Sequence, residues 1–231
     1  MKIALMVLGG LVLLGLAAMA VFVFYVQNVE TPVYRVVAQE GDFEVRDYPP
    51  LVVAEVRRQG PRQEALRAGF GPLARYIFAE ERGGERISMT APVTQQRPER
   101  ISMTAPVTAQ ALPDMAQGDD WAVRFIMPAR YGLEQLPAPA GSDVRLSEVP
   151  PRRVAAICFS GRASDELIAS KEETLRAWLA ARDLTPAAPA IYAFYNDPFT
   201  PGFLRRNEVI IDLAEAPAGV GASSPGAGAT P

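Results

Sequence analysis

ERISMTAPVT occupies residues 85–94, and an identical copy occupies residues 99–108 after the four residues QQRP. In each copy apolar side chains alternate with Ser, Thr and Pro, which is the period of a strand with one buried face. The apolar set is Ile87, Met89, Ala91 and Val93 in the first copy and Ile101, Met103, Ala105 and Val107 in the second. The duplication therefore predicts two strands of a sheet whose methionines face the core.

The simplest arrangement of the two copies is an antiparallel hairpin. Opposed residues in such a pair point to the same face, so apolar residues should lie opposite apolar residues. Both apolar sets have odd residue numbers, so the numbers of two paired residues must add up to an even value. Pairing Val93 with Ile101 satisfies this condition and leaves QQRPE (95–99) as a five-residue loop. The proline of each copy cannot donate to a ladder, so we expect it at a bulge or an unpaired edge. The alternative is that one copy loops out of the sheet.

The segments around the duplication have the patterns of short strands and two amphipathic helices. Strands are predicted at residues 33–39, 43–48, 51–59, 121–128, 144–150, 152–161, 190–196 and 207–213. Helices are predicted at 61–81 and at 165–182, with Ser164 as the N-cap of the second. This order of elements is typical of an α+β domain with a largely antiparallel sheet.

The first predicted helix carries an apolar stripe made of Leu66, Phe70, Leu73 and Ile77. Their spacing of three and four residues places them on one side of a helix. Gly69, Gly71 and Pro72 interrupt the same segment and weaken the helix at its middle.

Composition excludes several classes of site. None of the 231 residues is a histidine, which removes imidazole bases, Ser-His or Cys-His pairs and imidazole metal ligands. Cys158 is the single cysteine, so neither an internal disulfide nor a cysteine zinc site can form. The net charge of −3 provides no basic surface for nucleic acid.

The two ends of the chain differ from the body between them. Residues 3–29 carry no charge, and the apolar run at 3–26 is long enough to cross a bilayer. We interpret residues 1–29 as a single-pass signal anchor in an inner membrane. Lys2 before the run favours a cytoplasmic N-terminus and an extracytoplasmic, periplasmic domain. Cleavage after Ala18-Met19-Ala20 is the alternative. The body then covers residues 30–214, and the Ala/Gly/Ser/Pro-rich tail at 215–231 is predicted to be disordered.

The body resembles the SOUL haem-binding protein family. The resemblance rests on FEVRDYPPLVVAEV, on the helix ending LARYIF, on the ISMTAPVT segments followed by VRFIMPARYGLEQLP, and on the closing YNDPFTPGFLRRNEVII. The doubled MTAPV segment is shared with many bacterial members. The resemblance implies a pseudo-two-fold, distorted antiparallel β-barrel flanked by two helices. It also implies binding of haem or a related tetrapyrrole in an apolar groove beside the first helix.

Matching the EALR stretch to the family places the implied groove residues on the first helix. Arg67 would be the cation for a porphyrin propionate and Phe70 an apolar contact, with Leu66, Leu73 and Ala74 on or beside the same stripe. Core packing is the competing interpretation for Phe70.

No residue stands out as an axial iron ligand, and no metal site is predicted. Met89 and Met103 follow the inward alternation of their strands, and Cys158 lies in the apolar segment VAAICF, as expected for a buried and unreactive thiol. Tyr192 and Tyr195 point to opposite faces of one strand. The run Arg205-Arg206-Asn207-Glu208 is interpreted as structural, with an arginine bridging a carboxylate and Asn207 ordering the entry to the last strand.

The sequence therefore favours a non-enzymatic tetrapyrrole-binding module that holds haem without a histidine ligand. A pocket for another flat amphipathic molecule is the alternative, and an acidic residue inside the pocket would favour a cationic ligand. Catalysis is disfavoured because no nucleophile and base are paired in the sequence, although Glu80, Glu81 and Glu85 cluster after the first helix. A scaffolding role in the envelope is a further possibility that no residue pattern selects, and protein partners are not identified.

Overall fold

The computed structural model describes residues 9–10, 13–15, 29–80, 82–97 and 120–214. Two long helices, two short 3₁₀ helices and nine strands are present in the described body. The helices are α2 (Arg62–Ile77), α3 (Asp165–Ala180), η1 (Leu133–Gln135) and η2 (Gly202–Leu204). The strands are β1 (Arg35–Glu40), β2 (Phe43–Tyr48), β3 (Leu51–Gln59), β4 (Val93–Gln96), β5 (Asp120–Ile126), β6 (Arg145–Val149), β7 (Arg152–Phe159), β8 (Ile191–Phe194) and β9 (Asn207–Asp212).

The predicted ends of the chain lie largely or wholly outside this body. Within the described ranges, no helix is both long enough and apolar enough to cross a bilayer. The predicted anchor at 3–26, the second copy of the duplication at 99–108 and the tail at 215–231 fall almost entirely outside those ranges. The anchor and the tail therefore remain predictions.

All nine strands belong to one antiparallel sheet in the order β1-β2-β7-β9-β8-β4-β5-β3-β6. No ladder of the described strands joins β1 to β6, so the sheet is open and the predicted closed barrel is wrong. The predicted α+β class and antiparallel sheet are confirmed. The tertiary reason for the open form is that each outermost strand pairs on one edge only, β1 with β2 and β6 with β3.

The strand order has the pseudo-two-fold symmetry that the resemblance implies. Without β1 the order is β2-β7-β9-β8 in one half and β4-β5-β3-β6 in the other. The equivalent strands are β2 and β6, β3 and β7, β4 and β8, and β5 and β9. Exchanging the members of each pair gives the same order read from the other end of the sheet. The two halves meet where β4 pairs with β8. The link from β2 to β3 and the link from β6 to β7 are both Pro-Pro, which forces a corner because neither proline can extend a ladder.

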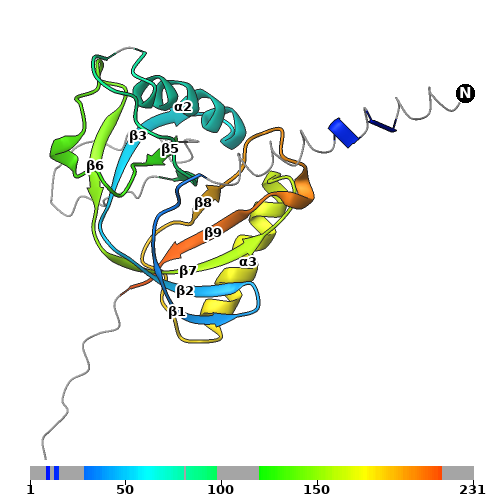
Figure 1. Ribbon diagram of the computed structural model, residues 1–231. Helices are drawn as coiled ribbons and strands as arrows, with labels where there is room; N and C mark the ends of the chain where they lie inside the picture. The colour runs from blue at the N-terminus through cyan, green and yellow to red at the C-terminus, as the bar shows by residue number, and fades with distance from the viewer. Residues whose placement is uncertain (1–8, 11–12, 16–28, 81, 98–119, 215–231) are drawn as a thin grey trace, which may run out of the picture.

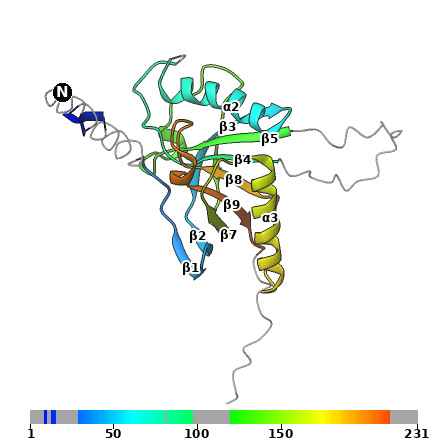
Figure 2. The same cartoon turned by 90° about the vertical axis from the view of Figure 1, so that its right-hand side faces the viewer.

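Both long helices lie on the same face of the sheet. Phe125 and Val123 of β5 pack with α2, whereas Val209 and Ile211 of β9 pack with α3. These residues share one face because the ladders through β4 and β8 connect them in register. Figure 1 shows α2 over the upper part of the sheet and α3 beside the lower part, and Figure 2 shows the same separation.

The beginnings of the two helices are joined by one buried arginine. Arg62 at the start of α2 donates to Asp165 at the start of α3 (Nε to Oδ1, 2.5 Å) and to the carbonyl of Ala163 (2.8 Å). Ser164 caps α3 as predicted, since its side chain accepts the N–H of Leu167. The two halves are therefore fixed to each other on the helix face.

The contact face of α2 is rotated from the predicted stripe. The residues in the middle of its contact are Ala65, Gly69 and Leu73, and a β-carbon added to Gly69 would lie 2.7 Å from Cγ2 of Val123. A residue without a side chain is thus required where α2 crosses β5. Because the helix sits on its small residues, Phe70 lies to the side of the contact and is 38% exposed, whereas Leu73 and Ile77 of the same predicted apolar stripe are buried.

The first copy of the duplication contributes an interior strand and not a hairpin arm. Val93 pairs with Phe125 on one edge and with Phe194 on the other. Both edges are occupied, so the predicted pairing of Val93 with Ile101 is wrong. Gln95 and Gln96, which were predicted to lie in the loop, are part of β4.

The residues before β4 do not alternate as a regular strand would. Ile87 and Ala91 are buried as predicted, but Met89 is 37% exposed and its predicted core position is wrong. The segment 85–92 forms only one bridge, between Thr90 and Glu30, so no ladder maintains the period of two. The Thr90 hydroxyl instead turns inward and donates to the carbonyl of Ile126.

Candidate functional site

Three of the five residues implied as tetrapyrrole contacts lie on the outward side of α2. Arg67, Phe70 and Ala74 follow one another at spacings of three and four, and Phe78 continues the row at the helix end. Arg67 is exposed, Ala74 is half-buried, and Phe70 and Phe78 are each 38% exposed. We call these four residues the α2 stripe. It presents a cation at one end of an apolar row.

The ring of Phe70 is held in place from below by the sheet. It meets Phe125 edge to face, with ring centroids 5.1 Å apart and planes at 67°. This geometry is favourable for an aromatic pair and fixes the exposed side of the Phe70 ring. Phe70 therefore combines partial core packing with an accessible face.

The two leucines implied at the site have different environments. Leu66 is half-buried against the cluster beneath α2 and borders the α2 stripe. Leu73 is fully buried against the sheet, so it supports the helix and offers no surface to a ligand. The structure thus brings Arg67, Phe70 and Ala74 together with Leu66 at their border, and separates Leu73 from them.

A small cavity lies on the other side of α2. Its volume is about 50 Å³, and its walls include Pro72, Arg75, Tyr76, Arg82 and Asp143. Pockets for drug-sized ligands have volumes of roughly 300–1,000 Å³. This cavity is too small to hold a porphyrin.

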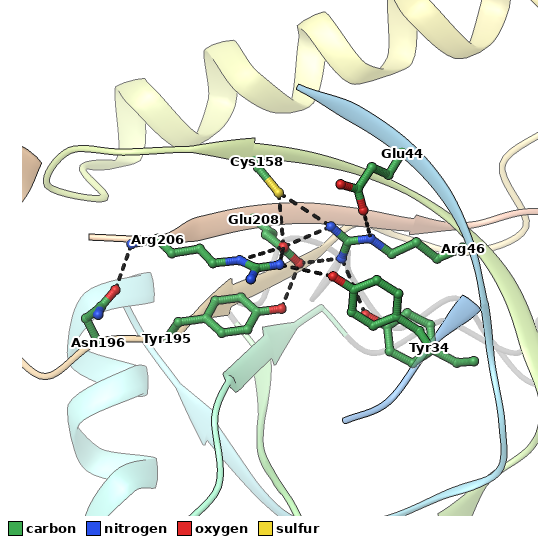
Figure 3. A network of polar contacts seen from close by, with 9 residues as sticks. Tyr34, Glu44, Arg46, Cys158, Tyr195, Asn196, Arg206 and Glu208 are labelled. Atoms are coloured by element: carbon green, nitrogen blue, oxygen red, sulfur yellow. Dashed lines mark hydrogen bonds and ion pairs between the residues drawn. The ribbon is translucent and has the colours of Figure 1, made fainter. Parts of the chain in front are cut away.

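The face of the sheet opposite the helices contains a buried charge network that sequence reasoning missed (Figure 3). Glu208 of β9 accepts two hydrogen bonds from Arg46 of β2, at 2.8 and 3.0 Å, and two from Arg206, at 2.6 and 3.1 Å. The Tyr195 hydroxyl donates to the same carboxylate at 2.8 Å. The side chains of Arg46 and Glu208 are both 0% exposed.

The segment before β1 covers this network. Tyr34 lies with its ring against the Arg46 guanidinium, 4.4 Å from ring centroid to Cζ, and its hydroxyl accepts from Arg206 at 3.2 Å. Glu44 accepts from Nε of Arg46 at 2.7 Å. Two arginines and two glutamates therefore balance their charges inside the network, which is the condition under which buried charges are tolerated.

Electrostatics inside the network favour the charged forms of the ion pairs and the neutral form of the thiol. Burial alone would raise the pKa of Glu208, but the hydrogen bonds and charges of Arg46 and Arg206 lower it to about 2. Burial and the neighbouring Glu208 carboxylate raise the pKa of Cys158 to about 12. Burial and Glu208 also raise the pKa of Tyr195.

Two of the minor predictions can be compared with this geometry. Cys158 is only partly buried and its thiol donates to Glu208 at 3.1 Å, so its predicted apolar surroundings are wrong, although its raised pKa keeps it a weak nucleophile. Tyr192 and Tyr195 point to opposite faces, as predicted: Tyr192 donates to Glu172 of α3, whereas Tyr195 reaches Glu208.

The structural interpretation of the RRNE run is confirmed. Arg206 bridges Glu208, and Asn207 donates to the carbonyl of Gly161 at 3.0 Å where β9 begins. The sequence signal for the wider network was the alternation of Glu44, Arg46 and Tyr48 in β2, which places three polar residues on one face. Their common partner on β9 could not be identified, because strands 162 residues apart in sequence form that contact.

The chemistry of these groups is that of binding and structural stability. Over the described parts of the chain, no group of three or more Cys, Asp or Glu residues is arranged to hold a metal ion. The Glu208 carboxylate is occupied by two arginines and is not available as a base. The α2 stripe offers an apolar surface and a guanidinium, which suits a flat anionic molecule.

The sequence was compared with protein families and with curated proteins. The family profile of the SOUL heme-binding protein matches residues 29–212. Among curated proteins, none matches the sequence.

Two solved structures, both of EcmrR, share the fold at low sequence identity. The EcmrR C-terminal domain has a TM-score of 0.54 and 9% identity, covering 80% of this chain and 99% of its own. An EcmrR–DNA complex has a TM-score of 0.52 and 8% identity, covering 87% of this chain and 65% of its own. A structure described as a hydrolase from Listeria innocua has a TM-score of 0.48 and 12% identity, covering 77% and 94%. At these identities the likeness to the two EcmrR structures concerns the fold alone. Since the family profile spans nearly the whole described body, the chain belongs to the SOUL haem-binding protein family.

Proposed function

We propose that the protein binds haem or a related tetrapyrrole on the α2 stripe, without catalysis and without a histidine ligand to iron. The observation that carries the proposal is the row of Arg67, Phe70, Ala74 and Phe78 on a helix that is seated rigidly on the sheet. A porphyrin ring would lie against the aromatic side chains, and one propionate would pair with Arg67. Family membership supports the class of ligand.

The absence of histidine shapes the expected binding mode. Because none of the 231 residues is a histidine, ring contacts and propionate pairing must supply most of the affinity. Protoporphyrin without iron should then bind about as well as haemin.

Another flat amphipathic molecule is the second candidate ligand. A cationic ligand would need an acidic group at the site, and the buried acid of this fold, Glu208, is already paired with Arg46 and Arg206. The exposed charge on the α2 stripe is positive. The structure therefore favours an anionic ligand within this broader class.

The test is a spectroscopic titration of residues 29–214, a fragment that contains all nine strands and all three core clusters. Haemin should give a saturable Soret shift without a bis-histidine spectrum. Arg67→Glu should weaken binding about tenfold or more, since it replaces a charge-assisted bond with repulsion. Arg145→Glu makes the same charge change at an exposed residue of β6, on the face opposite α2, and should leave binding unchanged.

The titration also discriminates between the two ligand classes. A saturable response to haemin and protoporphyrin that is lost in Arg67→Glu supports the tetrapyrrole proposal. Unsaturable spectra for both rings, combined with saturable binding of a non-porphyrin aromatic anion, would favour the second candidate. Equal weakening by Arg67→Glu and Arg145→Glu would contradict binding on the α2 stripe.

We further propose that residues 3–26 anchor the protein in the inner membrane with the body on the periplasmic side. The support is the uncharged apolar run and Lys2 before it. Resistance of the membrane-bound chain to alkaline carbonate extraction, together with digestion of the body by protease added to spheroplasts, is the expected result. Release by carbonate would contradict the anchor, and protection from protease would contradict the orientation.

A further inference from the structure

The loop between β8 and β9 holds two phenylalanines in solvent. Phe199 is 85% exposed and Phe203 is 79% exposed, and Leu204 beside them is 42% exposed. They are the two most exposed aromatic side chains among the large apolar residues that the structure describes. Neighbouring exposed aromatics of this kind mark a surface that contacts a partner.

The loop is ordered by polar contacts within itself. Asp197 accepts the N–H groups of Phe199 and Thr200, at 2.7 and 3.1 Å. Arg205 donates to the carbonyls of Thr200 and Pro198, at 2.7 and 2.5 Å. The backbone N–H of Gly161 also donates to the carbonyl of Gly202, at 2.8 Å. The exposure of the two rings is therefore a consequence of a hydrogen-bonded loop and not of an unstructured one.

The loop lies on the side of the body where the described segment 29–80 begins. Both views show the orange segment near the blue stretch that leads into β1 (Figures 1 and 2). Arg206, two residues after Leu204, donates to the hydroxyl of Tyr34 at 3.2 Å. Glu30, four residues before Tyr34, is fixed to the body because its carbonyl accepts the N–H of Ala91 at 2.9 Å.

The distance between this region and the apolar run is limited by chain length. Val26 ends the run, and four residue steps separate it from Glu30. Four fully extended steps span at most about 14 Å. If residues 3–26 are in a bilayer, the body around Glu30 cannot be farther than this from the membrane surface.

The charges beside the loop suit a membrane surface. The side chain of Arg162 is exposed and lies against Gly202, with its Cγ 3.5 Å from the position of an added β-carbon there. Arg206 also flanks the loop, with its guanidinium paired to Glu208 and its side chain 45% exposed. Phenylalanine and leucine beside an exposed arginine such as Arg162 are the composition of segments that lie in the headgroup region of a bilayer.

We propose that residues 197–204 form a membrane-contact loop, in which Phe199 and Phe203 enter the lipid interface beside the point where the N-terminal run joins the body. The inference rests on the proposed anchor. It adds that the body has a defined orientation on the bilayer, with the β8–β9 loop facing lipid.

The experiment uses the full chain in nanodiscs that hold one copy each, with lipids brominated on the acyl chains as quenchers. Phe199→Trp and Phe203→Trp should lose about half or more of the added tryptophan fluorescence, because rings at the interface meet the bromine atoms. The wild type supplies the background from Trp121 and Trp178. Val37→Trp is the matched control, since Val37 is 45% exposed on the edge strand β1 and should not be quenched.

Each outcome has one meaning. Quenching at 199 and 203 but not at 37 supports the membrane-contact loop. A chain that stays with the nanodisc while neither loop tryptophan is quenched overturns the loop inference and leaves the anchor intact. A blue-shifted but unquenched loop tryptophan also overturns it, because the ring is then covered by protein and not by lipid. Failure of the chain to stay with the nanodisc overturns the anchor and the inference together.

Discussion

The two pseudo-symmetric halves of the sheet differ in how deeply they bury an ion pair on the face opposite the helices. On β9, Glu208 is completely buried between Arg46 and Arg206. On β5, the counterpart strand, Arg124 points to the same face and pairs with Glu55 at 2.7 Å, but their side chains remain 24% and 12% exposed. The same fold thus contains one sealed ion pair and one that water can reach.

The difference arises from what covers each half. Tyr34, just before the edge strand β1, lies over the half that contains Glu208, where its ring contacts both Arg46 and Tyr48. A buried ion pair contributes little net stability when intact, but it is costly to break because it leaves a buried charge uncompensated. An exposed pair is worth little in either state. Equivalent strands in the two halves can therefore differ in how much stability is lost when an ion pair on them is broken.

The largest expected effect is from Glu208→Gln. It leaves the buried Arg46 and the partly exposed Arg206 facing a neutral amide and should cost about 3–5 kcal/mol of unfolding free energy. Arg124→Gln breaks the counterpart pair and should cost about 1 kcal/mol or less. Urea unfolding of residues 29–214 measures both, and equal losses would remove the distinction between the halves.

Acid should reveal the same asymmetry. The folded-state pKa of Glu208 is about 2, below its ordinary value of 4.5, so its contribution is fully present above pH 4.5 and is lost as the pH falls towards 2. The wild type should lose stability across this window. Glu208→Gln should show a smaller decline over the same pH range by circular dichroism. Burial raises the pKa of Glu55, but Arg124 and Arg57 lower it below its ordinary value, so Arg124→Gln should also reduce the decline, by less than Glu208→Gln does. A wild-type slope in Glu208→Gln would contradict the lowered pKa.

The helix side provides a smaller test. α2 contacts the sheet through Gly69, whereas α3 uses the large side chains of Ile168, Leu175 and Leu179. Gly69→Ala should destabilise the body by about 1–3 kcal/mol, because the new methyl group clashes with Val123.

The control for this test is two residues away. An added β-carbon at Gly71 meets only the end of Arg75, at 3.5 Å. Gly71→Ala should therefore be neutral or stabilise the helix by up to about 1 kcal/mol. Equal effects of the two substitutions in thermal unfolding would mean that Gly69 is not a close-contact position.

The smallest effect concerns reactivity and not stability. The Cys158 thiol should resist alkylation by iodoacetamide at pH 8, because its pKa is about 12. In Glu208→Gln the neighbouring negative charge is gone and Arg46 remains, so the pKa should fall and alkylation should accelerate. Rates measured in urea, where both proteins are unfolded, should be equal. An unchanged rate in the folded variant would show that Glu208 does not control the thiol.

Much of the fold could be predicted from local sequence patterns. Strand β3 was predicted with its observed bounds, and Ser164 caps α3 as expected, because alternation and capping act over a few residues. The duplication misled the pairing for the same reason. Two identical neighbours suggested a hairpin, but β4 pairs with β5 and β8, and those contacts are not encoded within the repeated segment.

The candidate site was predictable in part. Arg67, Phe70 and Ala74 share one side of α2 by helical geometry, so the sequence and the family resemblance were sufficient to place them together. Whether Leu73 or Phe70 faced the sheet depended on the rotation of the helix, and that rotation is set by the fit of Gly69 against Val123. A glycine that appeared to weaken the helix is the residue that allows it to dock.

By itself, the sequence determined the class of the fold, the positions of most strands and both helices, the family, and the absence of any histidine ligand. These properties follow from periods of two and three to four residues and from composition, which need no knowledge of distant contacts. Only the tertiary structure decided that Glu208 is sealed beneath Tyr34, that the sheet stays open, and that Phe199 and Phe203 are displayed in solvent. The burial of Glu208 and the order of the strands depend on contacts between segments far apart in the chain, and the display of the two phenylalanines depends on the three-dimensional form of their loop. Local periodicity does not specify either.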